Sequence, residues 1–334
     1  MRGAGDLVYD GTSGVMNKSG ELELLLKSFE EDFQIYDTEA QNEAIAVPFT
    51  SYNDRTRIVY KAACLGLKDY FHKNGYTKAC VGLSGGIDSS VVACLAVGAL
   101  GAENVKGLMM PSQFSSDESV EDAVKLAKNL GIDFSVLPIT ESYTAIMNTL
   151  KPVTGGTEFY ATEENFQSRI RTVLLMALQN KDGYVLLNSS NKSENAIGWC
   201  TLYGDTAGAF SVTGDLYKSE IYDLARYINS KFGDVIPEDI LKKEPTSELR
   251  PNQKDSDILP PYEVVDAILY RMIEQGQHRE EIINAGFDSE VVEKIHNMVM
   301  RNVKKRYQYP PVLRLSNSSF RHECLFPLVN KYGY

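Results

Sequence analysis

The segment 78–90 reads Lys-Ala-Cys-Val-Gly-Leu-Ser-Gly-Gly-Ile-Asp-Ser-Ser, and it decides the fold class of this chain. Its first six residues are mostly apolar and predict a short buried strand over 78–83. Gly85 and Gly86 allow a tight turn, and a helix is predicted to follow at 89–100. A helix that starts directly after such a turn presents free backbone N–H groups and the positive end of its dipole to an anion. The segment therefore predicts a phosphate-binding turn in an α/β protein.

Strands and helices alternate around this segment. Further strands are predicted at 105–110, 133–138 and 184–188, and helices from Asn53 or Asp54 to about 72 and at 116–130, 163–181 and 218–231. Alternation with short connections predicts a doubly wound parallel sheet with helices on both faces. The glycine turn would then lie at the carboxyl edge of the sheet, where ligands of such folds bind. Beyond a polar loop at 245–261, helices at 262–274, 279–285 and 289–307 predict a helical C-terminal part.

Composition narrows the class of protein. The 334 residues are 43% hydrophobic and 24% charged, which suits one large globular domain or two smaller ones. A net charge of −11 gives no indication of a nucleic-acid or anionic-membrane surface. The five cysteines are scattered without a CxxC pair, so neither a zinc site nor a disulfide framework is expected. With no signal peptide or membrane-spanning run evident, a cytoplasmic protein is predicted.

The first residues differ from the rest of the chain. Over 1–37, short apolar pieces are separated by turn signals such as Asp10-Gly11 and Ser19-Gly20, a pattern typical of a β-meander too small to fold alone. Residues 38–51 are polar and read as a linker. We therefore expect a division into 1–46 and 47–334.

A simpler interpretation of the glycine turn is a structural turn followed by a serine N-cap. The seven-residue string after an apolar strand is a more specific signal than such a turn. It is not a Walker loop, because no GxxxxGK[ST] occurs in the chain. Ser84–Ser90 (SGGIDSS) resembles the pyrophosphate loop of the N-type ATP pyrophosphatases, which include NAD, GMP and asparagine synthetases. The resemblance implies an adenine nucleotide alpha hydrolase-like fold and a reaction that splits ATP between its α and β phosphates.

Five further segments, in the family's order, point to the NAD synthetases. Glu164–Arg171 resembles the ENxQxRxR helix, and Asn188–Glu194 resembles the GTxNKSE loop with Asn and Ser in place of Gly and Thr. Thr201–Asp205 and Gly214–Lys218 are similar to the YGD and DLxK segments, and Pro245–Pro251 to the mobile PSAELRP loop. The resemblance runs from about residue 47 to the C-terminus.

The resemblance implies a ligase that adenylates the nicotinate carboxylate of deamido-NAD with ATP and then amidates it with ammonia, giving NAD and AMP. It assigns catalytic roles to Asp88, Lys218 and Asp205 and a Mg²⁺ site to Asp88 and Glu194. The expected ATP contacts are Ser84, Gly85, Gly86, Ile87, Asp88, Ser89, Ser90, Ser189, Lys218 and Thr246. The expected deamido-NAD contacts are Asn165, Arg169, Glu194, Trp199, Tyr203, Asp205 and Lys305.

Simpler roles exist for several of these residues. Glu194 could be a solvated helix-end charge, Asp205 a helix cap, and Lys305 a cation that complements a helix dipole. Trp199, the only tryptophan, could stack on the nicotinate ring or pack in a core. The alternative functions are a GMP synthetase, which the NKSE, YGD and PSELRP segments disfavour, and a nucleotide-binding module without ligase activity.

Residues 1–37 resemble the C-terminal edge of the nitrilase-like glutaminase domain that precedes the synthetase in glutamine-dependent family members. The Glu-Lys-Cys catalytic set of that domain would lie upstream, and the first cysteine here is Cys64. This predicts a truncated chain that uses free ammonia, with a natural N-terminal extension as the alternative. The resemblance also implies a homodimer.

Overall fold

The computed structural model describes residues 3–40, 54–154, 161–320, 324 and 326–328. Its centre is a sheet of five parallel strands in the order β7-β6-β5-β8-β9. The strands are β5 (Lys78–Gly82), β6 (Val105–Met109), β7 (Asp133–Val136), β8 (Tyr184–Asn188) and β9 (Phe210–Ser211). The predicted parallel α/β sheet is confirmed. β9, only two residues long, was not predicted, because so short a strand has no period to detect.

Alternating side chains of the central strands fill two separate cores. In β5, Ala79 and Val81 belong to one apolar cluster and Cys80 to another, and in β8 Leu187 and Leu186 divide in the same way. Successive side chains of a strand point to opposite faces, so both faces of this sheet are buried. This explains why the strands read as nearly continuous apolar runs in the sequence.

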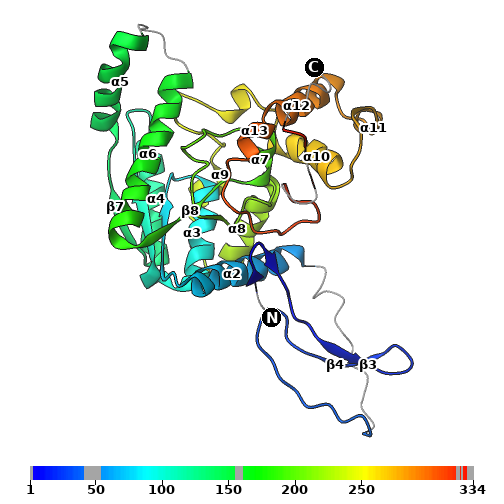
Figure 1. Cartoon of the computed structure of the whole chain (residues 1–334). Coiled ribbons are helices and arrows are strands. Elements are labelled where there is room, and N and C mark those ends of the chain that lie inside the picture. Colours follow the sequence, from blue (N-terminus) through cyan, green and yellow to red (C-terminus); the bar gives the residue numbers. More distant parts are fainter. Residues whose placement is uncertain (1–2, 41–53, 155–160, 321–323, 325, 329–334) are drawn as a thin grey trace.

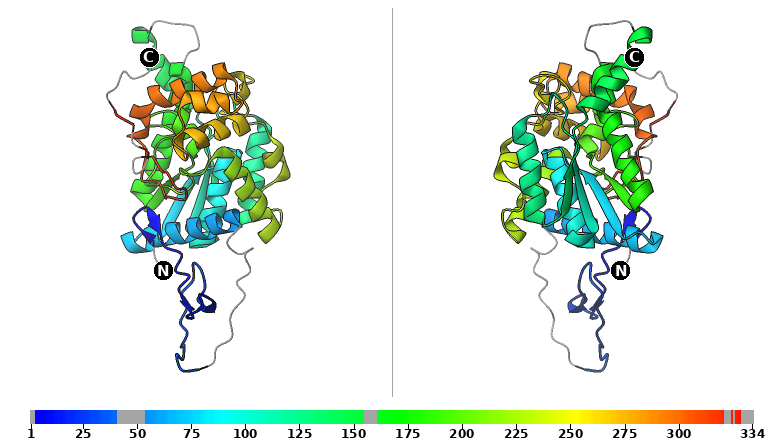
Figure 2. Two further views of the ribbon diagram at one scale, coloured as in Figure 1. Left: turned by 90° about the vertical axis from the view of Figure 1, so that its right-hand side faces the viewer. Right: turned by 90° about the vertical axis from the view of Figure 1, so that its left-hand side faces the viewer.

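Helices cover both faces, as Figures 1 and 2 show. The larger core lies under α2 (Arg55–Asn74), α3 (Ile87–Leu100), α4 (Asp117–Leu130) and α8 (Lys218–Phe232). The smaller core lies under α5 (Thr140–Thr154) and α6 (Ala161–Asp182). The doubly wound arrangement predicted from the alternation of strands and helices is therefore confirmed.

The C-terminal helices form a third core around a short helix. α10 (Tyr262–Ile273), α12 (Ser289–Arg301) and α13 (Val303–Arg306) pack beside α7 (Lys192–Ile197), and α11 (Arg279–Asn284) packs on α10 and α12, as Figure 1 shows. The single helix predicted at 289–307 is wrong at one point, since it is interrupted at Asn302. There the side-chain Nδ2 donates to Ile197 O and Met298 O, 2.8 and 2.9 Å away, which binds this break to α7.

Some helix predictions need correction. α3 begins at Ile87, two residues before the predicted start, because Gly86 is extended and already serves as the N-cap. α5 was not predicted, and it carries Pro152 near its C-terminal end, a residue that argues against a helix in sequence reading. α9 (Glu238–Lys242) was also missed, at only five residues. In the predicted loop 245–261 the structure has one 3₁₀ turn, η2 (Asp255–Asp257).

The N-terminal residues form two separate antiparallel pairs and not one meander. β1 (Gly3–Ala4) pairs with β2 (Leu7–Val8) against α2, where Gly3 N donates to Asp69 Oδ2 at 2.5 Å. β3 (Gly14–Met16) pairs with β4 (Leu22–Leu25) and extends away from the sheet, as Figure 1 shows.

Most of the predicted linker, from residue 41 to 51, and with it the expected boundary after residue 46, lies outside the described residues. Within the described part of the chain, no helix has the length and apolar character needed to cross a bilayer.

Candidate functional site

A cavity of about 300 Å³ opens at the carboxyl ends of β5 and β8. These two strands are neighbours, and the chain leaves β5 on one side for β6 and β7 and returns on the other side through β8. This point, where the strand order reverses, is where open α/β sheets bind their ligands. Residues 83–86 after β5, here called the phosphate loop, form one wall, and α6 and the segment 244–255 contribute others.

Gly85 is the point where the phosphate loop admits no side chain. Its φ of +77° lies in the left-handed region that favours glycine. A Cβ atom at this position would lie 2.2 Å from the backbone oxygen of Ser119 in the first turn of α4. The phosphate loop and α4 therefore pack backbone against backbone, which brings two helix N-termini to the same side of the cavity.

Hydroxyl groups of the loop and of the first turn of α3 hold the shape of the loop. Ser89 Oγ donates to Gly86 O at 3.1 Å and accepts the N–H of Ser84 at 3.3 Å, while Ser90 Oγ donates to Gly86 O at 2.8 Å. Ser84 Oγ accepts the N–H of Gly86 at 3.2 Å. Ser84 lines the cavity, but Ser89 and Ser90 are buried behind it. The hydroxyls of these two residues, predicted to contact ATP, both donate to Gly86 O of the loop.

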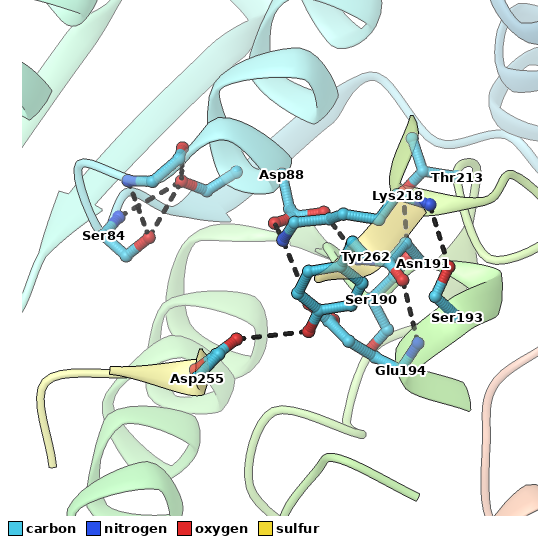
Figure 3. A network of polar contacts seen from close by, with 12 residues as sticks. Ser84, Asp88, Ser190, Asn191, Ser193, Glu194, Thr213, Lys218, Asp255 and Tyr262 are labelled. Carbon is cyan, nitrogen blue, oxygen red and sulfur yellow. Dashed lines mark hydrogen bonds and ion pairs between the residues drawn. The ribbon is translucent and has the colours of Figure 1, made fainter. Parts of the chain in front are cut away.

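Three charged side chains from three elements meet at the cavity wall, as Figure 3 shows. Lys218 Nζ, from α8, lies 2.5 Å from Asp88 Oδ2 of α3 and 3.2 Å from Glu194 Oε1 of α7. The second oxygen of Asp88 accepts a hydrogen bond from Asn191 Nδ2 at 2.8 Å. The Lys218 ammonium also lies over the ring of Tyr262, 5.2 Å from its centroid. We call Asp88, Glu194 and Lys218 the charged triad.

Charges and burial act in opposite directions on this triad. Burial alone would lower the pKa of Lys218, but Asp88 and Glu194 raise it above the usual lysine value. Burial raises the pKa of Glu194, against the opposing effect of Lys218. Lys218 is therefore held as a cation between the two carboxylates.

A second layer of polar contacts holds Lys218 at the start of α8. Its backbone N–H donates to Ser193 Oγ at 2.9 Å, and Ser193 Oγ donates to Asp266 Oδ1 at 2.5 Å. The other Asp266 oxygen accepts the N–H of Ser219 at 2.8 Å. A lysine in the first helical turn is normally unfavourable. Here the carboxylates of Asp88, Glu194 and Asp266 compensate for it.

Lys192 fixes the loop that carries Asn191 and Glu194. It is fully buried, and its Nζ lies 2.5 Å from Glu274 Oε1 and 3.1 Å from Asp215 Oδ1. Asp215 lies three residues before Lys218, so this ion pair joins the chain segments that supply Glu194 and Lys218. Breaking such a buried pair is costly, because it leaves an uncompensated charge behind.

The charged triad suits a Mg²⁺ ion that is shared with a nucleotide. Mg²⁺ is usually bound by one or two carboxylates together with substrate phosphates, and not by a full protein cage. Asp88 and Glu194 offer two such carboxylates on the cavity wall. In the described part of the chain no three His, Cys, Asp or Glu side chains form a metal-binding group, so phosphate oxygens would have to complete the coordination.

Most of the residues predicted to bind ATP, and some of those predicted to bind deamido-NAD, line the cavity. Its wall includes the following predicted residues: Ser84, Gly85, Gly86, Ile87, Asp88, Ser189, Glu194, Trp199, Asp205, Lys218 and Thr246. Trp199 is partly buried against the C-terminal core as well, so both of its expected roles are compatible with its position.

Four residues predicted for deamido-NAD lie around the segment 198–206 and not on the cavity wall. Asn165 Oδ1 accepts from Thr201 Oγ1 at 2.7 Å, and Arg169 Nε donates to Leu202 O at 3.1 Å. Lys305 Nζ donates to Gly198 O and Cys200 O at 2.7 and 2.8 Å. Tyr203 is 67% exposed with a φ of +62°. Asn165, Arg169 and Lys305 thus support the segment 198–206, and contact of the four residues with a dinucleotide stays a prediction.

Asp205 connects that segment to the cavity. Its Oδ1 accepts the N–H of Thr201 at 2.6 Å, and its own N–H donates to Ser168 Oγ of α6 at 2.9 Å. The carboxyl is accessible from the cavity, but the protein packed around it raises its pKa to about 6, against the opposing effect of the Thr201 N–H. A carboxylate of this kind can accept a proton near neutral pH.

The segment 244–255 crosses the cavity and is fastened by Glu248. Glu248 Oε1 accepts from Ser116 Oγ at 2.9 Å, from Ser119 Oγ at 2.7 Å and from Lys243 Nζ at 3.3 Å, while Oε2 accepts the N–H of Ser116 at 3.2 Å. Ser116 is the N-cap of α4, so a carboxylate here is favoured by the helix dipole. Thr246, predicted to contact ATP, donates to Gln253 O at 2.5 Å.

Sequence reasoning missed several residues of the cavity. Ser168, Arg171, Thr172 and Leu175 all line it from α6. Their spacing of three, four and seven residues marks one helix face, so the periodicity of the predicted helix could have found them. Lys243 and Asp255 lie in a stretch without periodicity, and no sequence signal placed them here.

Comparison with known proteins agrees with this geometry. A sequence model of the NAD synthase family, described as "NAD synthase", matches residues 59–309. The chain belongs to the NAD synthase family. Over 363 aligned residues it is 44% identical to a glutamine-dependent NAD(+) synthetase of Aquifex aeolicus, with 99% of this chain and 64% of that protein covered.

Two solved structures are similar to the whole or to most of the chain. A glutamine-dependent NAD+ synthetase from Acinetobacter baumannii in complex with ADP has a TM-score of 0.67 and 39% identity, covering 98% of this chain and 60% of that one. An NH3-dependent NAD synthetase from Campylobacter jejuni has a TM-score of 0.61 and 28% identity, covering 76% and 97%. The expected NAD synthetase fold is thereby confirmed. The chain spans less than two thirds of the length of the glutamine-dependent relatives.

Proposed function

We propose that this chain catalyses the ATP-dependent amidation of deamido-NAD, with ammonia as the nitrogen donor, to give NAD, AMP and pyrophosphate. The observation that carries the proposal is the position of the charged triad beside the phosphate loop in one cavity, in a member of the NAD synthase family. A phosphate-binding loop alone would fit many functions. The triad adds the groups that phosphoryl transfer needs, which are a cation and carboxylates that can hold a metal.

The first step activates a carboxylate, which is a poor electrophile. An oxygen of the nicotinate carboxylate attacks the α-phosphorus of ATP, and the bond from that phosphorus to the bridging oxygen breaks, releasing pyrophosphate. The phosphate loop and the N-terminus of α3 would bind the departing phosphates through backbone N–H groups. Lys218 would stabilise the negative charge that develops on them. A Mg²⁺ ion held by Asp88 and Glu194 would neutralise part of the same charge.

The second step forms the amide. The lone pair of ammonia attacks the carbonyl carbon of the acyl adenylate, the carbon–oxygen bond to AMP breaks, and the nitrogen gives up a proton. Asp205 is the residue that we assign to this proton, because it lies on the cavity wall with a pKa raised to about 6. It would accept a proton from ammonium or hold ammonia near the adenylate.

We extend the proposal to the organisation of the protein. The alignment with the Aquifex aeolicus protein covers 99% of this chain, which supports residues 1–46 as the end of a preceding glutaminase domain and residues 47–334 as the synthetase domain. In a longer chain of that kind glutamine would supply the ammonia. A homodimer and a cytoplasmic location complete the proposal, both by analogy with the family.

The test is the reaction itself. Purified protein is incubated with ATP, Mg²⁺, ammonium and deamido-NAD, and NAD and AMP are quantified by chromatography. We expect equal amounts of the two products, and a loss of about 100- to 1,000-fold in rate for Asp88→Ala. Asp223→Ala, which changes an exposed aspartate of α8, is the matched control and should leave the rate unchanged.

Two results would contradict the proposal. Turnover of xanthosine monophosphate in place of deamido-NAD would identify a GMP synthetase. Binding of ATP without product, in a folded protein supplied with every substrate, would favour a nucleotide-binding module.

A further inference from the structure

Three cationic side chains line the cavity within the described part of the chain: Arg171, Lys218 and Lys243. Lys218 is neutralised by Asp88 and Glu194. Lys243 is paired with Glu248, at 3.3 Å, and also bonds Ser119 Oγ. Arg171 differs from both, because it forms no salt bridge with any described residue, and its hydrogen bond runs from Nε to Met110 O at 2.9 Å.

The surroundings of Arg171 make this unpaired state unusual. Burial lowers the pKa of its guanidinium to about 10, and Glu248 and Asp205 are near enough to oppose that shift. Both carboxylates are bonded elsewhere, Glu248 to Ser116 and Ser119 and Asp205 to the N–H of Thr201. A partly buried guanidinium without a salt bridge is unfavourable unless an anion joins it.

The position of Arg171 in α6 places it at the mouth of the site. Leu175 lies over the end of β5, where its Cδ1 is 3.4 Å from the position of a Cβ on Gly82. α6 leads directly into β8, which runs parallel to β5, so α6 runs antiparallel to both strands. Arg171 is four residues, or about 6 Å along the helix, closer to the carboxyl edge than Leu175. That is the edge from which the phosphate loop emerges.

The contact with Met110 also fixes the direction of the guanidinium. Met110 directly follows β6, so the Nε–H bond ties Arg171 to the strand on the far side of β5 from β8. Once Nε is bonded, the two terminal nitrogens remain available as a planar pair of donors. Such a fork matches the geometry of two phosphate oxygens, which a lysine cannot reproduce.

We propose that the guanidinium of Arg171 binds phosphate oxygens of the nucleotide in this cavity, because among the described cations of its wall it is the one without a carboxylate partner. This inference rests on the proposed function, since it requires a nucleotide to occupy the site. It assigns Arg171 to ligand binding, and it separates Arg171 from Arg169, whose Nε is bonded to Leu202 O outside the cavity.

The experiment compares the binding of ADP and of adenosine to the folded protein by calorimetry, in the presence of Mg²⁺. Arg171→Met removes the donors and keeps a side chain of similar reach. We expect it to weaken ADP binding about 10- to 100-fold and to leave adenosine binding within about twofold, because adenosine has no phosphate. Arg171→Lys keeps the charge without the fork and should weaken ADP binding about 3- to 10-fold.

The matched control is Arg306→Met. Arg306 is a buried guanidinium bonded to Ala196 O and Val299 O, 2.7 and 2.8 Å away, and it does not line the cavity. Its loss should lower the melting temperature without changing the affinity of the folded protein for ADP. If Arg171→Met does not fold, the binding of ADP and of adenosine is compared in Arg171→Lys.

The outcomes separate this inference from the proposed function. Unchanged ADP affinity in the Arg171 variants, or an equal loss for ADP and adenosine, would overturn the role of Arg171 while a wild type that forms NAD keeps its function. A wild type that binds no ADP at all would overturn both. A selective loss for ADP, absent in Arg306→Met, would establish the contact.

Discussion

The phosphate loop and the segment 244–255 line the same cavity but are held in different ways. In the loop, the hydrogen bonds of Ser84, Ser89 and Ser90 connect residues at most five positions apart. In the segment, Glu248 reaches Ser116 across 132 positions, and Leu249 O accepts from Gln167 across 82. The hydrogen bonds of the loop are thus local in the sequence, whereas the segment is fastened to α4 and α6 by residues far away in the chain. The loop should be rigid and the segment able to open.

The backbone dihedral angles of the loop and of the segment differ as well. Gly85 provides the loop's positive φ, of +77°. The segment instead places two side-chain-bearing residues in the left-handed region, Glu248 at +47° and Asn252 at +53°. A positive φ costs a residue with a Cβ roughly 1–2 kcal/mol. The contacts of Glu248 offset that cost in the closed position, so a loss of those contacts favours opening.

The largest expected effect comes from adding a methyl group to the loop with Gly85→Ala. The new Cβ would meet Ser119 O at 2.2 Å in a backbone conformation that alanine disfavours. We expect a loss of about 2–4 kcal/mol in the free energy of unfolding, from strain and overpacking together, and a loss of ATP binding. Chemical denaturation and calorimetry with an ATP analogue measure the two effects.

Gly131→Ala is the control for that prediction. Gly131 ends α4 with a φ of +66°, and an added Cβ there would have no neighbour within 4 Å. It should lose only about 1 kcal/mol and keep ATP affinity. Equal behaviour of the two variants would show that the approach of Ser119 to the loop has no consequence for binding.

A smaller effect is expected from Glu248→Gln, which removes the charge at the N-terminus of α4. The position of the segment against α4 should become about 1–2 kcal/mol less stable relative to an open position, because hydrogen bonds to a charged group are stronger than those to a neutral one. Hydrogen exchange in residues 244–255 should rise about tenfold, and trypsin should cut more readily after Lys254. Exchange in the phosphate loop should not change.

Glu244→Gln is the matched control for the segment. Glu244 is exposed and paired with Lys254 at 2.7 Å, an ion pair with little effect on stability. Faster exchange in Glu244→Gln as large as that in Glu248→Gln would mean that the contact with α4 does not hold the segment closed.

The smallest effect concerns pH and Asp205 on the cavity wall. The pKa of Asp205 is raised to about 6, so its carboxyl is ionised above that pH and protonated below it. If Asp205 accepts a proton in amide formation, kcat/KM calculated on the concentration of free ammonia should fall about tenfold per unit as the pH drops below about 6. Asp205→Asn should have a lower rate and lack this acidic limb. An acidic limb that survives in Asp205→Asn would assign the titration to another group.

The sequence was sufficient for the parts of the molecule that depend on neighbours along the chain. Apolar runs and their spacing predicted β5, β6, β7 and β8 and the helices α3, α4 and α6, because strand and helix periods are local properties. The failures were also local in origin. β9 and α9 are too short to show a period, α5 carries Pro152, and the N-terminal pairs lack a continuous pattern.

For the site, the sequence by itself predicted the phosphate loop, through its glycines, and the resemblance of its segments to NAD synthetases pointed to the three residues of the triad. Only the tertiary structure decided which charges are neutralised. It paired Lys218 with Asp88 and Glu194, buried Lys192 between Asp215 and Glu274, and left Arg171 without a carboxylate among the described residues. The energy of a charge depends on the distance to its partners and on the surrounding dielectric, and both are set by the packing of elements far apart in the chain.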